Sequence, residues 1–177
     1  INNTGVRRLH EYTPSADRKL GGGEADAYGR LVIEEVKPFI DQAYRTIPER
    51  RHTGIGGSSL GALVSLHLGL KHPEVFSRLA LHSPSVWWDR RMILRAVRAA
   101  RPKPDLRIWL DMGTAEGKRG LTDARALRTA FVRMGWREGG DLHYSEHEGA
   151  THSEAAWAER VGPMLGYLFG DRDGPSL

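Results

Sequence analysis

The chain has 177 residues, enough for one domain with a substantial core, and its 40% apolar and 27% charged residues are ordinary for a globular protein. It contains no cysteine, which excludes disulfides, thiol catalysis and thiolate metal sites. The net charge of +4 comes from scattered basic residues, and no apolar run approaches the ~20 residues needed to span a bilayer. We therefore expect neither a nucleic-acid nor a membrane partner. The polar N-terminus begins without Met and shows no signal peptide, which leaves the compartment open.

The first part of the chain combines a loop with a long helix. Residues 1–24 predict an irregular loop, because Pro14 and the run at 21–23 of three glycines are strong breakers. Apolar residues at helical spacing then predict a helix from Asp26 to Tyr44. Pro38 lies inside this pattern and should kink the helix or start a new turn.

Beyond residue 50, short apolar strands alternate with amphipathic helices. We expect strands over residues 52–56, 78–83, 106–111 and 142–146, and helices over 62–72, 91–100, 121–134 and 153–169. This alternation predicts an α/β fold: a mainly parallel sheet with helices on both faces, and functional residues at the carboxyl ends of its strands. We expect a single domain over 1–170 and a frayed tail over 171–177.

The most informative segment is Gly57-Ser58-Ser59-Leu60-Gly61, between a predicted strand and a predicted helix. This is the context of a nucleophile elbow, a sharp turn that exposes a serine hydroxyl. Glycines at 57 and 61 would let strand and helix pass where a Cβ would clash. An ordinary glycine-rich turn is the alternative, but the placement favours Ser59 as a nucleophile.

A serine hydroxyl needs a base to take its proton and an acid to orient that base. His152 follows the last predicted strand, and Glu116 follows the strand before it, so both lie on the expected functional edge. We interpret them as base and acid. His82 remains an alternative base and Asp111 an alternative acid, since both stand at strand ends.

The tetrahedral intermediate also needs donors for its oxyanion, and the elbow geometry supplies the backbone N–H of Leu60. No predicted strand before residue 50 could carry a second donor. Arg8, Tyr12, Trp87 and Trp88 are candidate substrate-binding residues, although the two tryptophans are equally suited to packing.

With these residues assembled, the chain resembles a family of esterases with the α/β-hydrolase fold. The family includes enterochelin esterase-like, feruloyl esterase-like and S-formylglutathione hydrolase-like enzymes and the mycolyltransferases. The resemblance covers nearly the whole chain and is carried by residues 56–63, 71–76, 83–88 and 113–116, and by His152 with Trp157. It implies a serine esterase that hydrolyses a small-molecule carboxylic ester through a Ser-His-acid triad and an acyl-enzyme. It implies no metal or organic cofactor.

Two departures from the family qualify this interpretation. The family acid is commonly aspartate, whereas Glu116 stands here, and family members carry several strands ahead of the segment Asn3-Thr4-Gly5. The chain therefore resembles a hydrolase without its front strands, whose sheet would expose an edge open to homo-oligomer formation. Two alternatives remain: an acyltransferase that uses the same triad, and an inactive esterase-like binding module.

Overall fold

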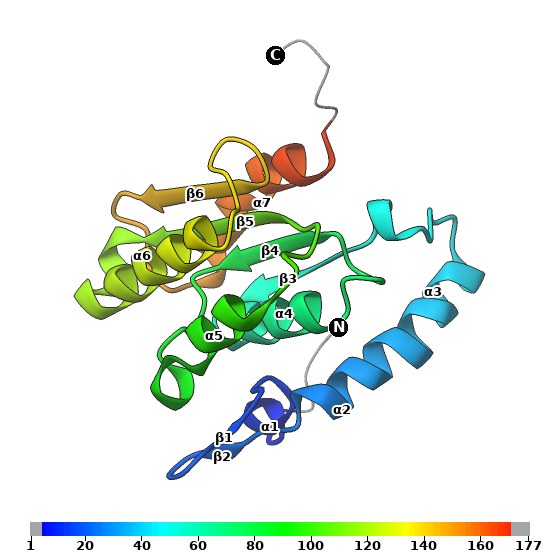
Figure 1. Cartoon of the computed structure of the whole chain (residues 1–177), viewed down its shortest axis with the longest axis horizontal. Helices are drawn as coiled ribbons and strands as arrows, with labels where there is room; N and C mark the ends of the chain where they lie inside the picture. The colour runs from blue at the N-terminus through cyan, green and yellow to red at the C-terminus, as the bar shows by residue number, and fades with distance from the viewer. Residues whose placement is uncertain (1–4, 171–177) are drawn as a thin grey trace.

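The computed structural model describes residues 5–170 (Figure 1). The predicted tail at 171–177 and the start of the Asn3-Thr4-Gly5 segment lie outside these residues. The centre of the fold is a parallel sheet in the order β3-β4-β5-β6. Its strands are β3 (Gly54–Ser58), β4 (Arg78–His82), β5 (Arg107–Gly113) and β6 (Leu142–His147). All four predicted strands are confirmed, except that His52 belongs to a 3₁₀ turn, η2 (Arg50–His52), ahead of β3.

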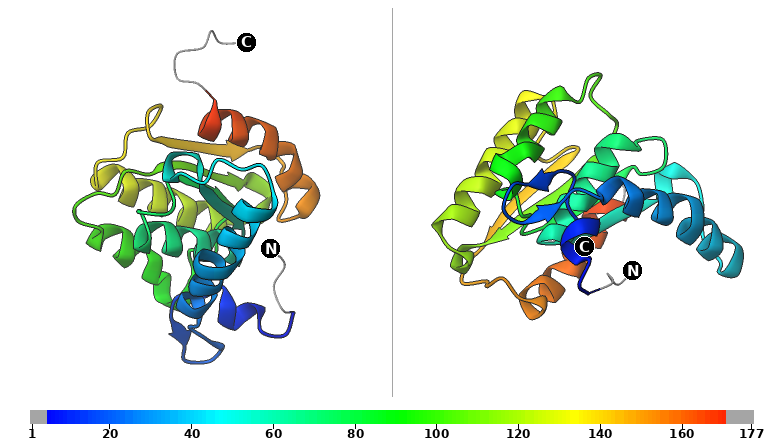
Figure 2. Two further views of the ribbon diagram at one scale, coloured as in Figure 1. Left: turned by 90° about the vertical axis from the view of Figure 1, so that its right-hand side faces the viewer. Right: turned by 90° about the horizontal axis from the view of Figure 1, so that it is seen from below.

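Helices cover the two faces of the sheet unequally (Figure 2). The crossovers contain α4 (Leu60–Lys71), α5 (Trp88–Ala99) and α6 (Lys118–Arg133), with the 3₁₀ turn η3 (Thr114–Glu116) before α6. Because each right-handed crossover advances to the next strand in the same direction, these three helices lie on one face. The last helix, α7 (Glu154–Phe169), covers the other face, with its N-cap at Ser153 as predicted.

Alternation along β4 separates the two sides of the core. Leu79 and Leu81 join the large cluster beneath α4, α5 and α6, whereas Ala80 faces α7. The smaller cluster under α7 consists of Ala80, Trp109, Met164 and Leu168. The same alternation turns His82 towards α7, which matters for the site described below.

The N-terminal region is more ordered than the sequence indicated. It forms a short helix, α1 (Arg8–Glu11), and an antiparallel hairpin of β1 (Ala16–Asp17) and β2 (Gly21–Gly22). The prediction of an irregular loop is wrong here because the glycines adopt positive φ angles, +74° at Gly21 and +93° at Gly22, and so permit the tight return. The Trp88 indole donates to the Ser15 carbonyl at 2.8 Å and joins this hairpin region to α5.

The predicted helix over 26–44 is continuous but changes its hydrogen-bond register. It comprises α2 (Ala25–Arg30), a π-helical segment η1 (Leu31–Val36) and α3 (Lys37–Ala43). The Lys37 N–H bonds to the Val32 carbonyl, five residues back, immediately before Pro38. Pro38 then occupies the first turn of α3, where the missing N–H costs little, so the irregularity precedes the proline.

Strand β3 lies at the edge of the sheet, with apolar side chains beside it. Ile40 from α3 lines a pocket on one side of the strand, and Leu165 and Phe169 from α7 line a groove on the other. All three are more than a third exposed. This is the open edge that the sequence predicts, and association through it stays a prediction. None of the described helices is both long and apolar enough to cross a membrane.

Candidate active site

Ser59 stands at the turn between β3 and α4 in a strained backbone conformation, with φ +58° and ψ −121°. A non-glycine residue keeps such angles only when its surroundings impose them. Here the Ser59 N–H donates to the His82 carbonyl at 3.0 Å, and the Ser59 carbonyl accepts from the Ser85 N–H at 3.1 Å. The turn is therefore held from the neighbouring strand end on both sides of the serine.

The two elbow glycines are not equivalent. A Cβ on Gly57 would lie 2.9 Å from the carbonyl carbon of Gly61, so strand and helix do meet backbone to backbone there. A Cβ on Gly61 would meet nothing closer than a Tyr12 ring atom at 4.0 Å. The expectation of a clash is thus confirmed for Gly57 and wrong for Gly61, because only the Gly57 Cα faces the opposite backbone.

Leu60 is the first residue of α4, directly after Ser59. The first N–H groups of a helix have no intrahelical acceptor and carry the positive end of its dipole. In α4 the first helical bond runs from the Leu63 N–H to the Ser59 carbonyl at 3.2 Å. The Leu60 N–H therefore belongs to the group of amides suited to a developing negative charge beside Ser59.

Glu116 and His152 lie on two adjoining loops and form a close pair. Glu116 belongs to η3 after β5, and His152 precedes α7, yet Glu116 Oε2 and His152 Nδ1 are 2.6 Å apart. The Glu116 side chain is 3% exposed and that of His152 is 47% exposed. The imidazole is thus open to a ligand, while its carboxylate partner is shielded from water.

The Glu116 carboxylate has two further donors on its other oxygen. Oε1 accepts from the Gly113 N–H at 2.8 Å and from the Ser83 hydroxyl at 2.6 Å. The loops themselves are joined, because the Ala115 N–H donates to the Ala150 carbonyl at 3.1 Å. The carboxylate orientation is therefore fixed independently of His152.

Ser59 and the Glu116–His152 pair have a common neighbour in Ser85. The Oγ atoms of Ser59 and Ser85 are 3.2 Å apart, and Ser85 lines a pocket of about 400 Å³ together with Trp87, Glu116 and His152. Across residues 5–170, the Ser59 hydroxyl has its hydrogen bond with Ser85 and none with His152. Glu116 and His152, the predicted acid and base, are thus in contact, whereas the Ser59 hydroxyl lies against a second serine.

The alternative base and the alternative acid pair with each other instead. His82 Nδ1 lies 2.6 Å from Asp111 Oδ2, and both side chains are buried on the α7 face of the sheet. Trp109 Nε1 also donates to Asp111, at 2.6 Å. Another histidine of this region, His147, lies 3.0 Å from the Ser145 hydroxyl, and burial lowers the pKa of its imidazole.

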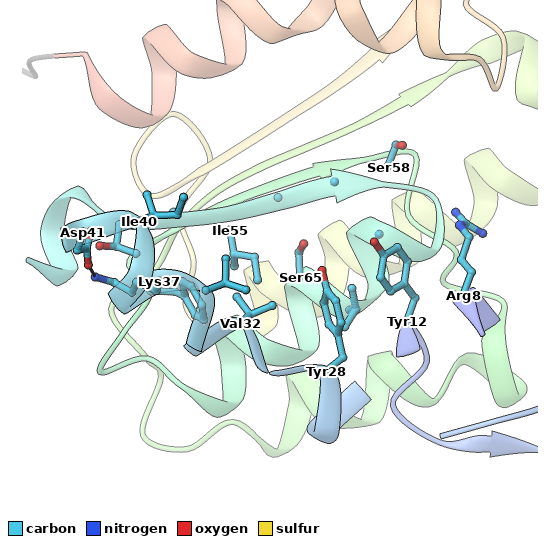
Figure 3. Close-up of a pocket in the computed structure, with 18 of the residues that line it drawn as sticks. Arg8, Tyr12, Tyr28, Val32, Lys37, Ile40, Asp41, Ile55, Ser58 and Ser65 are labelled. Atoms are coloured by element: carbon cyan, nitrogen blue, oxygen red, sulfur yellow. Dashed lines mark hydrogen bonds and ion pairs between the residues drawn. The ribbon is translucent and has the colours of Figure 1, made fainter. Parts of the chain in front are cut away.

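The four predicted substrate-binding residues do not share one site. Arg8 and Tyr12 line a different pocket of about 620 Å³ that follows β3 and has Ser58 at one end (Figure 3). Burial and the nearby Tyr12 raise the pKa of Tyr28 in this pocket. Trp87 is 40% exposed beside His152, whereas Trp88 is completely buried, which suits the packing role that the sequence left open.

Several side chains around Glu116 were not singled out as site residues by the sequence. Ser83 and Ser85 belong to the polar run that ends β4, so their position at a strand end was a usable signal. Trp157 entered only through the family resemblance. Arg160 gave no signal, because an arginine in a helix is normally exposed, yet here it is 3% exposed.

A parallel sheet whose strand turns through a strained serine into a helix, with a histidine–carboxylate pair on following loops, defines the α/β-hydrolase fold. Within that class, the chain belongs to the Putative esterase family, whose model matches residues 5–168. The match confirms the resemblance carried by the motifs.

Three relatives illustrate the range of the family. Uncharacterized protein YbbA of Bacillus subtilis is 26% identical, over 92% of this chain and 70% of its own length. The siderophore enterobactin esterase of Emericella nidulans is 29% identical, over 52% of this chain and 34% of its own. The crystal structure of the BES protein from Bacillus cereus superposes with a TM-score of 0.78 at 21% identity, covering 94% of this chain and 64% of that one. This chain therefore corresponds to only part of several relatives.

Proposed function

We propose that the chain is a serine esterase in which Ser59, His152 and Glu116 form the catalytic triad. The observation that carries the proposal is the 2.6 Å contact between His152 and the shielded Glu116 carboxylate, on the edge of the sheet where the strained Ser59 turn lies. Family membership supports ester hydrolysis in general. The triad and an acyl-enzyme are the specific form that these residues favour.

In the first half of the reaction, the Ser59 hydroxyl attacks the ester carbonyl carbon. His152 Nε2 takes the proton, while Nδ1–H stays bonded to Glu116, which orients the ring and stabilises the imidazolium. To reach His152, the hydroxyl exchanges its contact with Ser85 for one with the imidazole. Catalytic hydrogen bonds are often long or poorly aligned in a free enzyme and tighten only when the substrate binds.

The tetrahedral intermediate carries its negative charge on the former carbonyl oxygen. The Leu60 N–H, at the start of α4, is the proposed donor to this oxygen. Collapse of the intermediate breaks the bond to the alcohol, which takes its proton from His152. Water then attacks the acyl-enzyme by the same sequence of steps and releases the acid and free Ser59.

The proposed substrate class rests on the relatives, with support from one residue of the pocket. A relative named as a siderophore enterobactin esterase makes siderophore esters the first natural substrates to test. The exposed indole of Trp87 beside His152 offers an aromatic surface for such a ligand.

A fluorophosphonate probe tests the proposal, because it reacts covalently only with an activated serine. We expect labelling of the wild-type chain, none of Ser59→Ala, and retained labelling of Ser58→Ala, which removes the neighbouring hydroxyl. Hydrolysis of a p-nitrophenyl ester should follow the same order, and an added alcohol would reveal acyl transfer through its ester product. Absence of labelling in folded wild-type protein would favour the inactive binding module.

A further inference from the structure

Ser83 is a buried hydroxyl that the proposed mechanism does not use. It follows β4 directly, is 1% exposed and has a positive φ of 46°. Its Oγ donates to Glu116 Oε1 at 2.6 Å. It also accepts from two groups of α7: Trp157 Nε1 at 2.9 Å and Arg160 Nη2 at 3.3 Å.

The chemistry of these two partners fixes the direction of the Ser83 hydroxyl. An indole N–H and a guanidinium can only donate hydrogen bonds. Both therefore face the lone pairs of Ser83 Oγ, and the single hydroxyl proton has Glu116 Oε1 as its acceptor. A serine bonded to acceptors could rotate away from the carboxylate, whereas this one is held in the donating orientation.

Arg160 is itself paired with a buried counter-charge. Its Nη2 lies 3.3 Å from Asp111 Oδ1, and Asp111 is completely buried. Ser83 follows β4, Asp111 belongs to β5 and Arg160 to α7, so the cluster connects three elements beneath the site. The helix that carries Trp157 and Arg160 runs along this face of the sheet (Figure 2). The cluster thus joins three elements at one hydroxyl, while Arg160 Nε and Nη1 have no hydrogen-bond partner among the described residues.

We propose that Ser83, oriented by Trp157 and Arg160, is a positioning residue that holds the Glu116 carboxylate against His152. Ser83 lines the same pocket as Glu116 and His152, and its proposed role is exerted through the Glu116 carboxylate. The inference rests on the proposed role of Glu116 as the acid of the triad. The buried Asp111–Arg160 pair thereby acquires a role in the geometry of the site, through Ser83.

Removing the Ser83 hydroxyl tests this role, and the chain provides a matched control. Ser77 immediately precedes β4, just as Ser83 immediately follows it, and both serines are 1% exposed. The Ser77 hydroxyl likewise has a donor and an acceptor: it donates to the Arg50 carbonyl at 2.7 Å and accepts from Arg78 at 3.3 Å. We expect Ser83→Ala to lower kcat for a p-nitrophenyl ester by roughly 10-fold to 100-fold with KM changed less than about twofold. Ser77→Ala should leave both near the wild-type values. Ser83→Gly, which fits the positive φ, replaces Ser83→Ala if that variant fails to fold.

A second readout does not depend on activity. The short bond from His152 Nδ1–H to Glu116 should give a strongly downfield proton resonance in the NMR spectrum. We expect Ser83→Ala and Ser83→Gly to shift this resonance upfield or broaden it, and Ser77→Ala to leave it unchanged. An unchanged resonance and unchanged kcat in a folded Ser83 variant, or equal losses in Ser77→Ala, would overturn the proposal. Failure of the wild type to hydrolyse any ester would count against the esterase function, and the resonance would still test Ser83.

Discussion

At the residue scale, two carboxylates near the carboxyl end of one strand, β5, have different environments. Asp111 is fully buried and surrounded by His82, Trp109 and Arg160, whereas Glu116 bonds an imidazole that is open to ligands. The longer glutamate side chain reaches back from η3 to the His152 loop. The usual role of aspartate in this family is therefore compatible with a glutamate placed three residues beyond the end of the strand.

Substituting each carboxylate by its amide separates these roles. We expect Glu116→Gln to reduce kcat by about 10²–10⁴ with little change in the free energy of unfolding. The amide oxygen can keep the bonds from Gly113 and Ser83, whereas the amide NH2 cannot accept from His152 Nδ1–H. Asp111→Asn should instead lower the free energy of unfolding by about 3 kcal/mol, because it leaves Arg160 without its buried counter-charge. Steady-state kinetics and urea unfolding measure the two effects. A larger loss of turnover in folded Asp111→Asn would identify Asp111 as the acid.

At the scale of elements, the site depends on close contact between the loop after β5 and the loop after β6. A Cβ on Gly113 would lie 2.2 Å from the Ala150 carbonyl oxygen and 2.8 Å from Glu116 Oε1. Gly113 has an ordinary φ of −80°, so the glycine is required by the space and not by the backbone conformation. The Gly149 N–H adds a bond to the Thr114 hydroxyl at 2.8 Å.

Gly113→Ala should therefore separate the loops that carry Glu116 and His152. We expect kcat to fall roughly 100-fold, since a misplacement of about 1 Å between reacting groups can cost about 10²-fold in rate. Gly166→Ala in α7 is the control, because a Cβ there meets nothing within 4 Å and no proline follows it. It should keep wild-type turnover and gain about 0.5–1 kcal/mol of unfolding free energy. Wild-type kinetics in Gly113→Ala would show that the loop contact is not needed.

At the scale of the whole molecule, β3 is an edge strand of the described four-stranded sheet and pairs there with β4 alone. Its backbone groups face outward between the apolar side chains of Ile40 on one side and of Leu165 and Phe169 on the other. An edge strand with apolar flanks can pair with another chain. Homo-oligomer formation through this edge remains a prediction.

Sedimentation velocity over a range of concentrations tests association of the 177-residue chain. We expect the wild-type sedimentation coefficient to rise with concentration, and Leu165→Lys to weaken that rise because it adds charge beside β3. Val132→Lys is a matched control, since Val132 on α6 is 44% exposed against 47% for Leu165. A wild-type chain that stays monomeric throughout, or equal effects of both lysines, would contradict the prediction.

The sequence by itself determined the alternation of strands and helices and the position of the serine turn. These features depend on local signals: apolar periodicity, prolines, and glycines around Ser59. It also ordered His152 and Glu116 correctly on adjacent loops, because parallel strands bring their carboxyl ends to one edge. Local signals did not predict the N-terminal hairpin. A run of glycines is compatible both with an irregular loop and with a tight turn between two strands.

Only the tertiary structure decided which polar groups pair. His82 and Asp111 were rivals of the triad in the sequence, and they bond each other because alternation along β4 and β5 turns both towards α7. Ser83 and Arg160 are 77 residues apart, and nothing in the spacing of the sequence indicates that they meet beneath Glu116. Such contacts follow from the packing of α7 on the sheet, which involves the whole chain and no single segment of it.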